Sequence, residues 1–234
     1  MSKTKKAVII GSVLVGIGAI IGFIGIAIGG FKFPNGAVDL TTMKALHAEK
    51  KTVQIADAFD KIEIAGASSM DIEICKSKTG KNYVEYYDTD DWTSHVDVKE
   101  HVLKFTTDDK GKHKAVVSLG FGKDTAARLY LADAEYKEIA VTTLSGYVTI
   151  QNVNAGTVNV SASSGDIDLE RCDAEGFDIT TSSGDVDMEI TAERTYRFET
   201  KTNSGDVDVP DGDADSGYLC KIVTSSGDVD VKQK

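Results

Sequence analysis

The most constraining feature of the chain is a corner that its last ninety residues repeat five times. Each corner is a Ser-Gly pair followed by an alternating apolar and polar stretch, and successive glycines lie 19, 19, 21 and 22 residues apart. Glycine tolerates positive φ, so we assign a structural role as corners to Gly146, Gly165, Gly184, Gly205 and Gly227. Units this short cannot each bury a core, so the period predicts units that stack on one another.

The residues around each glycine predict two strands per unit. Apolar or small residues recur at period two on both sides of the corner, which places one set of side chains inward. In the third unit this register directs Val186 inward and Asp185 outward. We therefore expect an all-β fold, a β-solenoid or β-helix-like stack of coils of 19–22 residues, preceded by one transmembrane helix.

The helix is expected at the N-terminus. Residues 7–31 are apolar or small and carry no charge, which exceeds the roughly 20 residues that cross a bilayer. Lysines fill much of residues 1–6, which therefore form a cytoplasmic tail and leave the rest of the chain extracellular in a single-pass topology. A cleaved signal peptide is the alternative. Two GxxxG pairs in the helix favour self-association, although glycine is common in such helices anyway.

The remaining chain divides into a spacer and an ectodomain. Residues 32–52 are expected to form a juxtamembrane spacer, with either a short amphipathic helix or a flexible stalk over residues 37–51. Residues 53–231 are expected to form the β ectodomain. Within it, residues 53–130 have charged turns typical of irregular hairpins, and residues 131–231 hold the regular repeats.

Acidic residues dominate the ectodomain. The chain has 37 acidic residues, none before Asp39, and a net charge of −11. This balance excludes a nucleic-acid binder and favours cationic partners, either a peptide or an envelope protein. Three cysteines are too few for a disulfide framework, and an envelope that does not rely on disulfides is common for Gram-positive bacteria.

Eight aspartates of the last four corners are the candidate site. They lie one and three residues after the glycines and are expected to point outward in two adjacent columns: Asp166, Asp168, Asp185, Asp187, Asp206, Asp208, Asp228 and Asp230. Carboxylates suit Ca²⁺, so a weak calcium site is one reading and a face for cationic peptides is another. The third reading is a solvated face that keeps the sheet soluble. No other metal and no cofactor is expected.

No enzymatic motif accompanies these acids. Glycoside hydrolysis needs one pair of carboxylates in unlike environments, whereas these carboxylates repeat in the same setting from coil to coil. The sequence also has no nucleophile elbow, P-loop or dinucleotide fingerprint. We therefore predict no catalytic residues and no enzyme.

The corners resemble a known family. The repeated (Ser/Asn)-Ser-Gly-Asp-(Ile/Val)-Asp motif behind an N-terminal apolar segment is similar to the DUF4097 family, also named for a proposed adhesin role. The resemblance covers residues 59–231 and implies a β-solenoid in a bacterial cell envelope, in some cases beside envelope-stress systems. The first corner departs from the motif, because Tyr147 and Thr149 replace the two aspartates.

These observations predict a membrane-anchored, non-catalytic binding or sensing module of the cell envelope with an acidic face for cationic ligands. A surface adhesin or scaffold that uses the edges of the stack is the alternative, and a polysaccharide-processing enzyme is the third reading. The last strand ends near Val231, so we expect it to be an open edge that could also serve self-association.

Overall fold

The computed structural model describes residues 37–39, 44–45, 48–65, 70–89, 92–109, 116–118, 126–132 and 135–234. Residues 35–234 form one compact unit. The described residues contain no helix long and apolar enough to cross a membrane. The helix predicted over residues 7–31 lies outside them. The described part of the predicted spacer is strand, so the amphipathic-helix reading is wrong for those residues.

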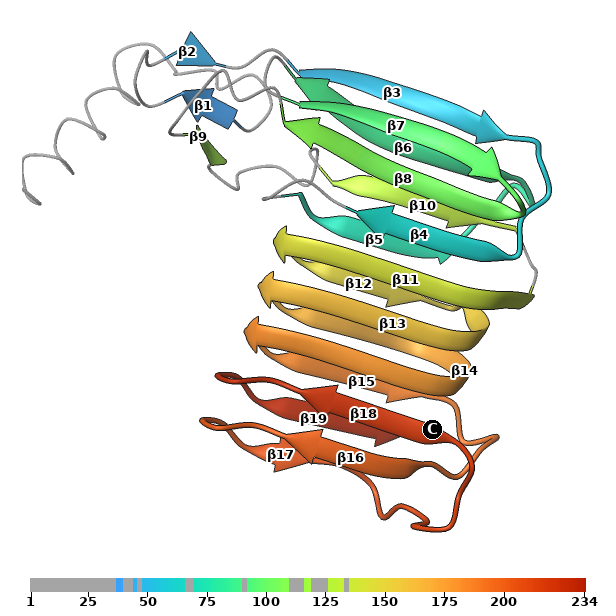
Figure 1. Cartoon of the computed structure of the whole chain (residues 1–234), viewed down its shortest axis with the longest axis vertical. Coiled ribbons are helices and arrows are strands. Elements are labelled where there is room, and N and C mark those ends of the chain that lie inside the picture. Colours follow the sequence, from blue (N-terminus) through green and yellow to red (C-terminus); the bar gives the residue numbers. More distant parts are fainter. Residues whose placement is uncertain are drawn as a thin grey trace, which may run out of the picture. The chain divides into compact units, whose positions relative to one another are not determined.

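The described strands form two sheets (Figure 1). The smaller sheet is antiparallel and has three strands, β1 (Ala37–Asp39), β2 (Lys44–Ala45) and β9 (Val116–Ser118). The larger sheet has 16 strands and carries the core.

An eleven-strand path runs through the larger sheet and folds back on itself at β14, which makes the sheet nearly closed. The first half of the path is β3 (Ala48–Ile55), β6 (Asn82–Thr89), β10 (Ala127–Leu131), β5 (Ile72–Lys76), β12 (Val148–Gln151) and β14 (Ile167–Ser183). The second half continues from β14 through β13 (Asn154–Ser164), β11 (Glu135–Ser145), β4 (Lys61–Ala65), β8 (Val102–Asp109) and β7 (Trp92–Lys99).

Five strands extend the sheet beyond β14. They are β15 (Val186–Ile190), β16 (Arg197–Lys201), β17 (Val207–Asp208), β18 (Leu219–Val223) and β19 (Val229–Gln233). Strands of different repeats pair in parallel and in register, so that Ile167 lies opposite Val186 and Val186 opposite Val229.

The prediction of a β-solenoid behind a transmembrane helix is wrong. The fold is all-β as expected, but its strands form one nearly closed sheet of mixed orientation, with β3, β6 and β10 antiparallel and β7 and β8 antiparallel. For β7 and β8 the reason is a tight turn in place of a glycine corner. The stretch from Val96 to Phe105 reverses at Glu100 and His101, whose φ values are 52° and 64°.

The order of the last two repeats also differs from the prediction. Strand β19 pairs with β15 on one side and with β17 on the other, and β18 lies between β14 and β16. The last repeat of the chain is therefore inserted between the third and the fourth (Figure 1). The expected open edge near Val231 is covered, because β16 and β17 form the end layer instead.

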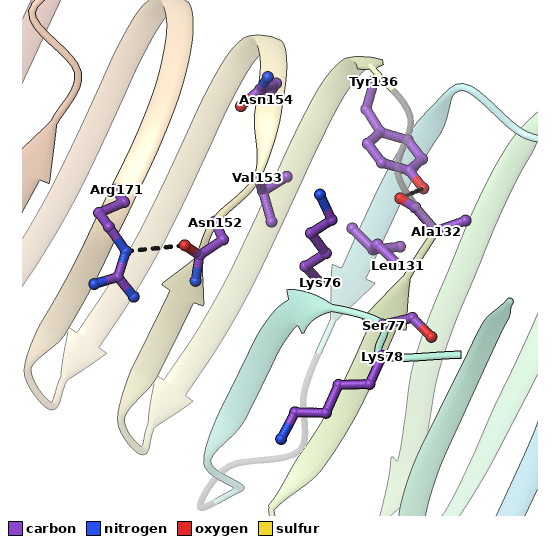
Figure 2. Close-up of a pocket in the computed structure, with 10 residues that line it drawn as sticks. All are labelled: Lys76, Ser77, Lys78, Leu131, Ala132, Tyr136, Asn152, Val153, Asn154 and Arg171. Atoms are coloured by element: carbon purple, nitrogen blue, oxygen red, sulfur yellow. Dashed lines mark hydrogen bonds between the residues drawn. The ribbon is translucent and has the colours of Figure 1, made fainter. Parts of the chain in front are cut away.

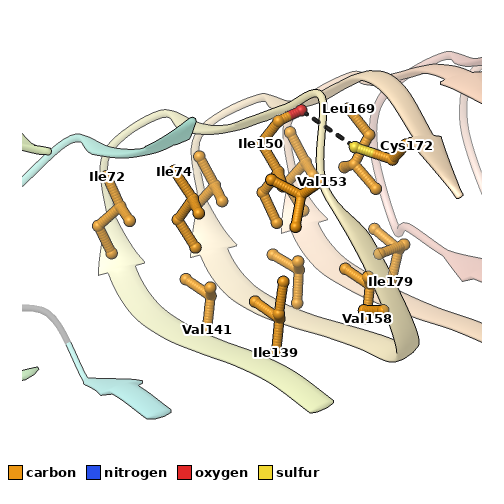
Figure 3. Close-up of a cluster of buried hydrophobic side chains, with 14 of the residues drawn as sticks. Ile72, Ile74, Ile139, Val141, Ile150, Val153, Val158, Leu169, Cys172 and Ile179 are labelled. Carbon is orange, nitrogen blue, oxygen red and sulfur yellow. Dashed lines mark hydrogen bonds between the residues drawn. The ribbon is translucent and has the colours of Figure 1, made fainter. Parts of the chain in front are cut away.

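The core lies between the two halves of the sheet (Figure 3). Ile72, Ile150, Leu169 and Ile179 are fully buried there, and the Cys172 thiol donates a hydrogen bond to the Ile150 carbonyl at 3.3 Å. Burial of each large aliphatic side chain contributes about 1.5–3 kcal/mol. The register agrees with the alternation, since Val186 is buried and Asp185 is exposed.

Candidate functional site

The acidic face begins where the corners end and the strands start. The five corner glycines have φ between 115° and 148°. Apolar residues two positions after the glycine enter the core in four of the five repeats, so the residues on either side of them face outward. The exception is Val207 in the end layer, which is 42% exposed because, among the described strands, β17 has β19 as its single neighbour.

Three of the four aspartates directly after the corners accept a hydrogen bond from a backbone N–H group. The carboxylate oxygen Oδ1 of Asp166 accepts a hydrogen bond from the Asp185 N–H at 2.9 Å. In the same way, Asp185 accepts from Asp228 N–H and Asp228 from Asp206 N–H, each at 2.8 Å. These bonds link neighbouring layers, and hydrogen bonds to an ionised acceptor are stronger than neutral ones.

The same position holds one acid that the sequence analysis missed. Asp71 accepts a hydrogen bond from the Tyr147 N–H at 2.9 Å, so it is a further member of this set. Residues 68–74 match the corner motif except that Met70 stands at the glycine position and Glu73 at the second aspartate, and this match was the available signal. We call Asp71, Asp166, Asp185 and Asp228 the rung aspartates.

The rung aspartates give a testable contrast. Changing Asp185 to alanine removes the acceptor for Asp228 N–H, and we expect the free energy of unfolding to fall by about 1 kcal/mol in urea denaturation. Asp185→Asn keeps an oxygen acceptor and removes one like charge from the column, so its stability should equal or exceed that of the wild type. Asp187→Ala is the control, because no hydrogen bond to the Asp187 carboxylate is found among the described residues. Equal stabilities of D185A and D187A would show that the rungs contribute nothing.

The aspartates three residues after the corners have a different environment. Asp168, Asp187, Asp230 and Asp208 lie opposite one another on β14, β15, β19 and β17, in that order across the sheet. We call these four residues the acidic strip. Strands in a sheet are about 4.8 Å apart, so the strip places like charges next to each other.

Little within the protein compensates the charge of the acidic strip. Lys232 Nζ lies 2.9 Å from the Asp230 carboxylate. Across the described part of the chain, no hydrogen bond or salt bridge reaches the carboxylates of Asp168, Asp187 or Asp208. Glu170 and Glu189 lie two residues further along the same strands and add negative charge, although Lys234 pairs with Glu189 at 2.7 Å.

Two carboxyl groups of the acidic strip have raised pKa values. Partial burial raises the pKa of Asp168, and the charges of Glu170 and Asp187 raise it further. The pKa of Asp187 is raised by burial first and then by Asp230 and Asp185. A raised pKa means that the folded state binds the proton more tightly than the unfolded chain. The ionised forms therefore oppose folding above these pKa values, and the cost disappears as the pH falls below the ordinary value near 3.8.

The geometry does not favour the calcium reading. Within the described ranges, no group of three or more histidine, cysteine or acidic side chains is placed to hold a metal ion. The eight predicted aspartates form two lines across the sheet, whereas Ca²⁺ needs six to eight oxygens converging on one point. The strip is a row of carboxylates on adjacent strands.

A comparison with models of protein families identifies the family, and solved structures show a similar fold. The family model described as Toastrack DUF4097 matches residues 59–234. No curated protein matches the chain. A crystal structure of a proposed cell adhesion protein from Clostridium sporogenes has 16% sequence identity, a TM-score of 0.58, and coverage of 81% of this chain and 100% of that one. A proposed adhesin from Bacteroides fragilis has 16% identity and a TM-score of 0.35, with 80% and 97% coverage.

Proposed function

The chain belongs to the Toastrack DUF4097 family, and from the geometry of its acidic face we propose that it is a non-catalytic binding module for cationic partners. The acidic strip carries this proposal. The rung aspartates have a structural role, because they bond the backbone of the next layer. The strip has no such role, and its like charges oppose folding.

An extended cationic ligand would relieve this cost. Ammonium or guanidinium groups placed along the strip neutralise several carboxylates at once, so the binding energy includes the repulsion that the free protein carries. The same environment recurs from layer to layer, which supports recognition of a repetitive or elongated partner and not one catalytic pair of acids. A lysine-rich peptide in an extended conformation is the simplest such ligand.

The test is binding of fluorescently labelled hexalysine to the purified full chain, followed by anisotropy across a salt series. We expect the affinity to fall steeply with ionic strength. The variant D168N/D187N/D208N/D230N should bind about tenfold or more weakly, since each exposed pair contributes up to about 1 kcal/mol.

The matched control variant is D57N/E175Q/D211N/D215N, which removes the same number of charges at exposed positions away from the strip. It should bind hexalysine nearly as well as the wild type. If both variants lose affinity equally, the affinity for hexalysine depends on the net charge of the protein and not on the acidic strip. If the wild type does not bind hexalysine at low salt, the proposed function is wrong.

A further inference from the structure

A pocket of about 530 Å³ opens at the corners opposite the glycines, where the strands of the first half of the sheet end (Figure 2). Its lining includes Lys76 at the end of β5, Lys78 after β5, Asn152 between β12 and β13, Asn154 at the start of β13, and Arg171 within β14. Its volume lies in the range of small-molecule sites. The pocket is separate from the acidic strip, because β14 is the one described strand that contributes to both, with Arg171 in the pocket and Asp168 in the strip.

The charge of the pocket is opposite to that of the protein. The chain has a net charge of −11, but the charged residues among the described lining are Lys76, Lys78 and Arg171. No salt bridge of Lys78 is found among the residues that the structure describes. A terminal guanidinium nitrogen of Arg171 lies 3.7 Å from Glu170. Glu189 is also near, since its hydrogen bond to Lys234 is the largest cause of its lowered pKa and the Arg171 charge lowers that pKa further. Three cations around one hollow create a local positive potential that attracts anions.

Arg171 is held in the pocket at a conformational cost. Its φ is 51°, and Asn152 in the neighbouring layer has a φ of 55°. Asparagine adopts this left-handed region readily, whereas arginine is uncommon there. The Arg171 Nε–H donates a hydrogen bond to Asn152 Oδ1 at 2.9 Å, which orients the guanidinium and leaves its terminal nitrogens for another acceptor (Figure 2). Strain of this kind concentrates at functional positions.

Neutral polar groups complete the lining. Asn152 and Asn154 are exposed residues of the lining, and the Tyr136 hydroxyl points toward Ala132 (Figure 2). Burial raises the pKa of Tyr136 to about 12, so this hydroxyl keeps its proton at neutral pH. Its hydrogen bonds to Asn82 Oδ1 and the Ala132 carbonyl are long, at 3.4 and 3.5 Å. Such groups suit the hydroxyls of a polar ligand.

We propose that this pocket binds a phosphate monoester of a small polyol. In this proposal Lys78 and Arg171 hold the phosphate, and Lys76 lines the same pocket. A phosphate monoester carries between one and two negative charges at pH 7 and offers three acceptor oxygens, whereas a carboxylate has one charge and two oxygens. Phosphate therefore matches a site with several cations better. The guanidinium fork and the lysine ammonium supply the charge-assisted hydrogen bonds.

The test is isothermal titration of the purified full chain with glycerol 3-phosphate, inorganic phosphate and glucuronate. We expect glycerol 3-phosphate to bind most tightly and glucuronate at least tenfold more weakly. The variant K78Q/R171Q should lose about tenfold or more of the affinity for glycerol 3-phosphate. The control K99Q/K201Q removes two exposed lysines elsewhere and should bind as the wild type does.

Two further arms complete the test. Arg171→Lys keeps the charge but not the fork, and we expect an affinity between those of the wild type and K78Q/R171Q. Co-sedimentation with phosphatidylcholine vesicles that contain phosphatidate shows whether a lipid headgroup supplies the phosphate in place of a free ester. Binding of glucuronate as tight as that of glycerol 3-phosphate would overturn the proposal, as would equal affinities of K78Q/R171Q and K99Q/K201Q. Hexalysine binding by K78Q/R171Q should be unchanged, which separates this site from the acidic strip.

Discussion

Changing Gly184 to alanine is expected to lower the free energy of unfolding by about 3 kcal/mol or more. Gly184 has a φ of 142°, and a Cβ built on it would lie 2.2 Å from the carbonyl oxygen of Gly165. The obstacle is backbone, so no rotamer change can relieve it, and the two layers would have to separate. Separation weakens the bonds from Gly165 N–H to Ser183 O and from Gly184 N–H to Ser226 O. Backbone strain and lost packing between the layers both lower the free energy of unfolding of this variant.

Two other glycines separate the causes of this effect. Gly80 has a φ of 67° but nothing within 4 Å of its built Cβ, so Gly80→Ala should cost only about 1 kcal/mol from strain. Gly217 has neither a positive φ nor a close neighbour, and Gly217→Ala should be nearly neutral. Urea denaturation of the three variants gives the comparison, with loss of the β-sheet circular dichroism signal as the readout if G184A does not fold. Equal effects of G184A and G80A would contradict the close stacking of the corners.

The corners and the faces of the strands could be predicted from the sequence because both are local. Alternation decides which side chains enter a core, and only glycine fits a corner where backbones stack this closely. The match of residues 68–74 to the corner motif was not predicted, because Met70 stands where the five corners have glycine. The mixed orientation of the sheet was missed for a similar reason, since Glu100 and His101 form a tight turn without the usual glycine or asparagine.

The partners between layers could not be predicted from the sequence. The rung bonds depend on which backbone N–H lies beside each carboxylate, and this requires the register between layers. The cationic pocket likewise combines residues from β5, β12 and β14 that are far apart in the sequence. No local sequence pattern indicates that these distant residues line one pocket.

The order of the last two repeats left one trace in the sequence. The fourth repeat has Thr200 where the others have Val141, Val160, Ile179 and Ile222. A layer with a single neighbour buries less side-chain surface, so the repeat with the more polar inner face suits the end. The eight residues between Val209 and Tyr218, with Pro210 and three aspartates, provide the length to pass from the end layer back to an inner one.

Ending the chain after Gly217 removes the last repeat, and we expect β16 and β17 to unfold as a result. Strand β16 has β18 as its hydrogen-bonded neighbour and β17 has β19, so the truncation removes every described strand partner of the end layer. It also removes the buried side chains of Ile222 and Val229. Hydrogen exchange followed by mass spectrometry should then show full exchange over residues 197–208, while β11 and β13 stay protected.

A stop after Val231 is the matched control. It removes Lys232, Gln233 and Lys234 but keeps β18 and the first half of β19, so residues 197–208 should remain protected. The two truncations also distinguish insertion from stacking in chain order. If the repeats stacked in chain order, the fourth would pack directly on the third and would survive the loss of the fifth. Protection of residues 197–208 after the stop at Gly217 would therefore contradict the inserted position of the last repeat.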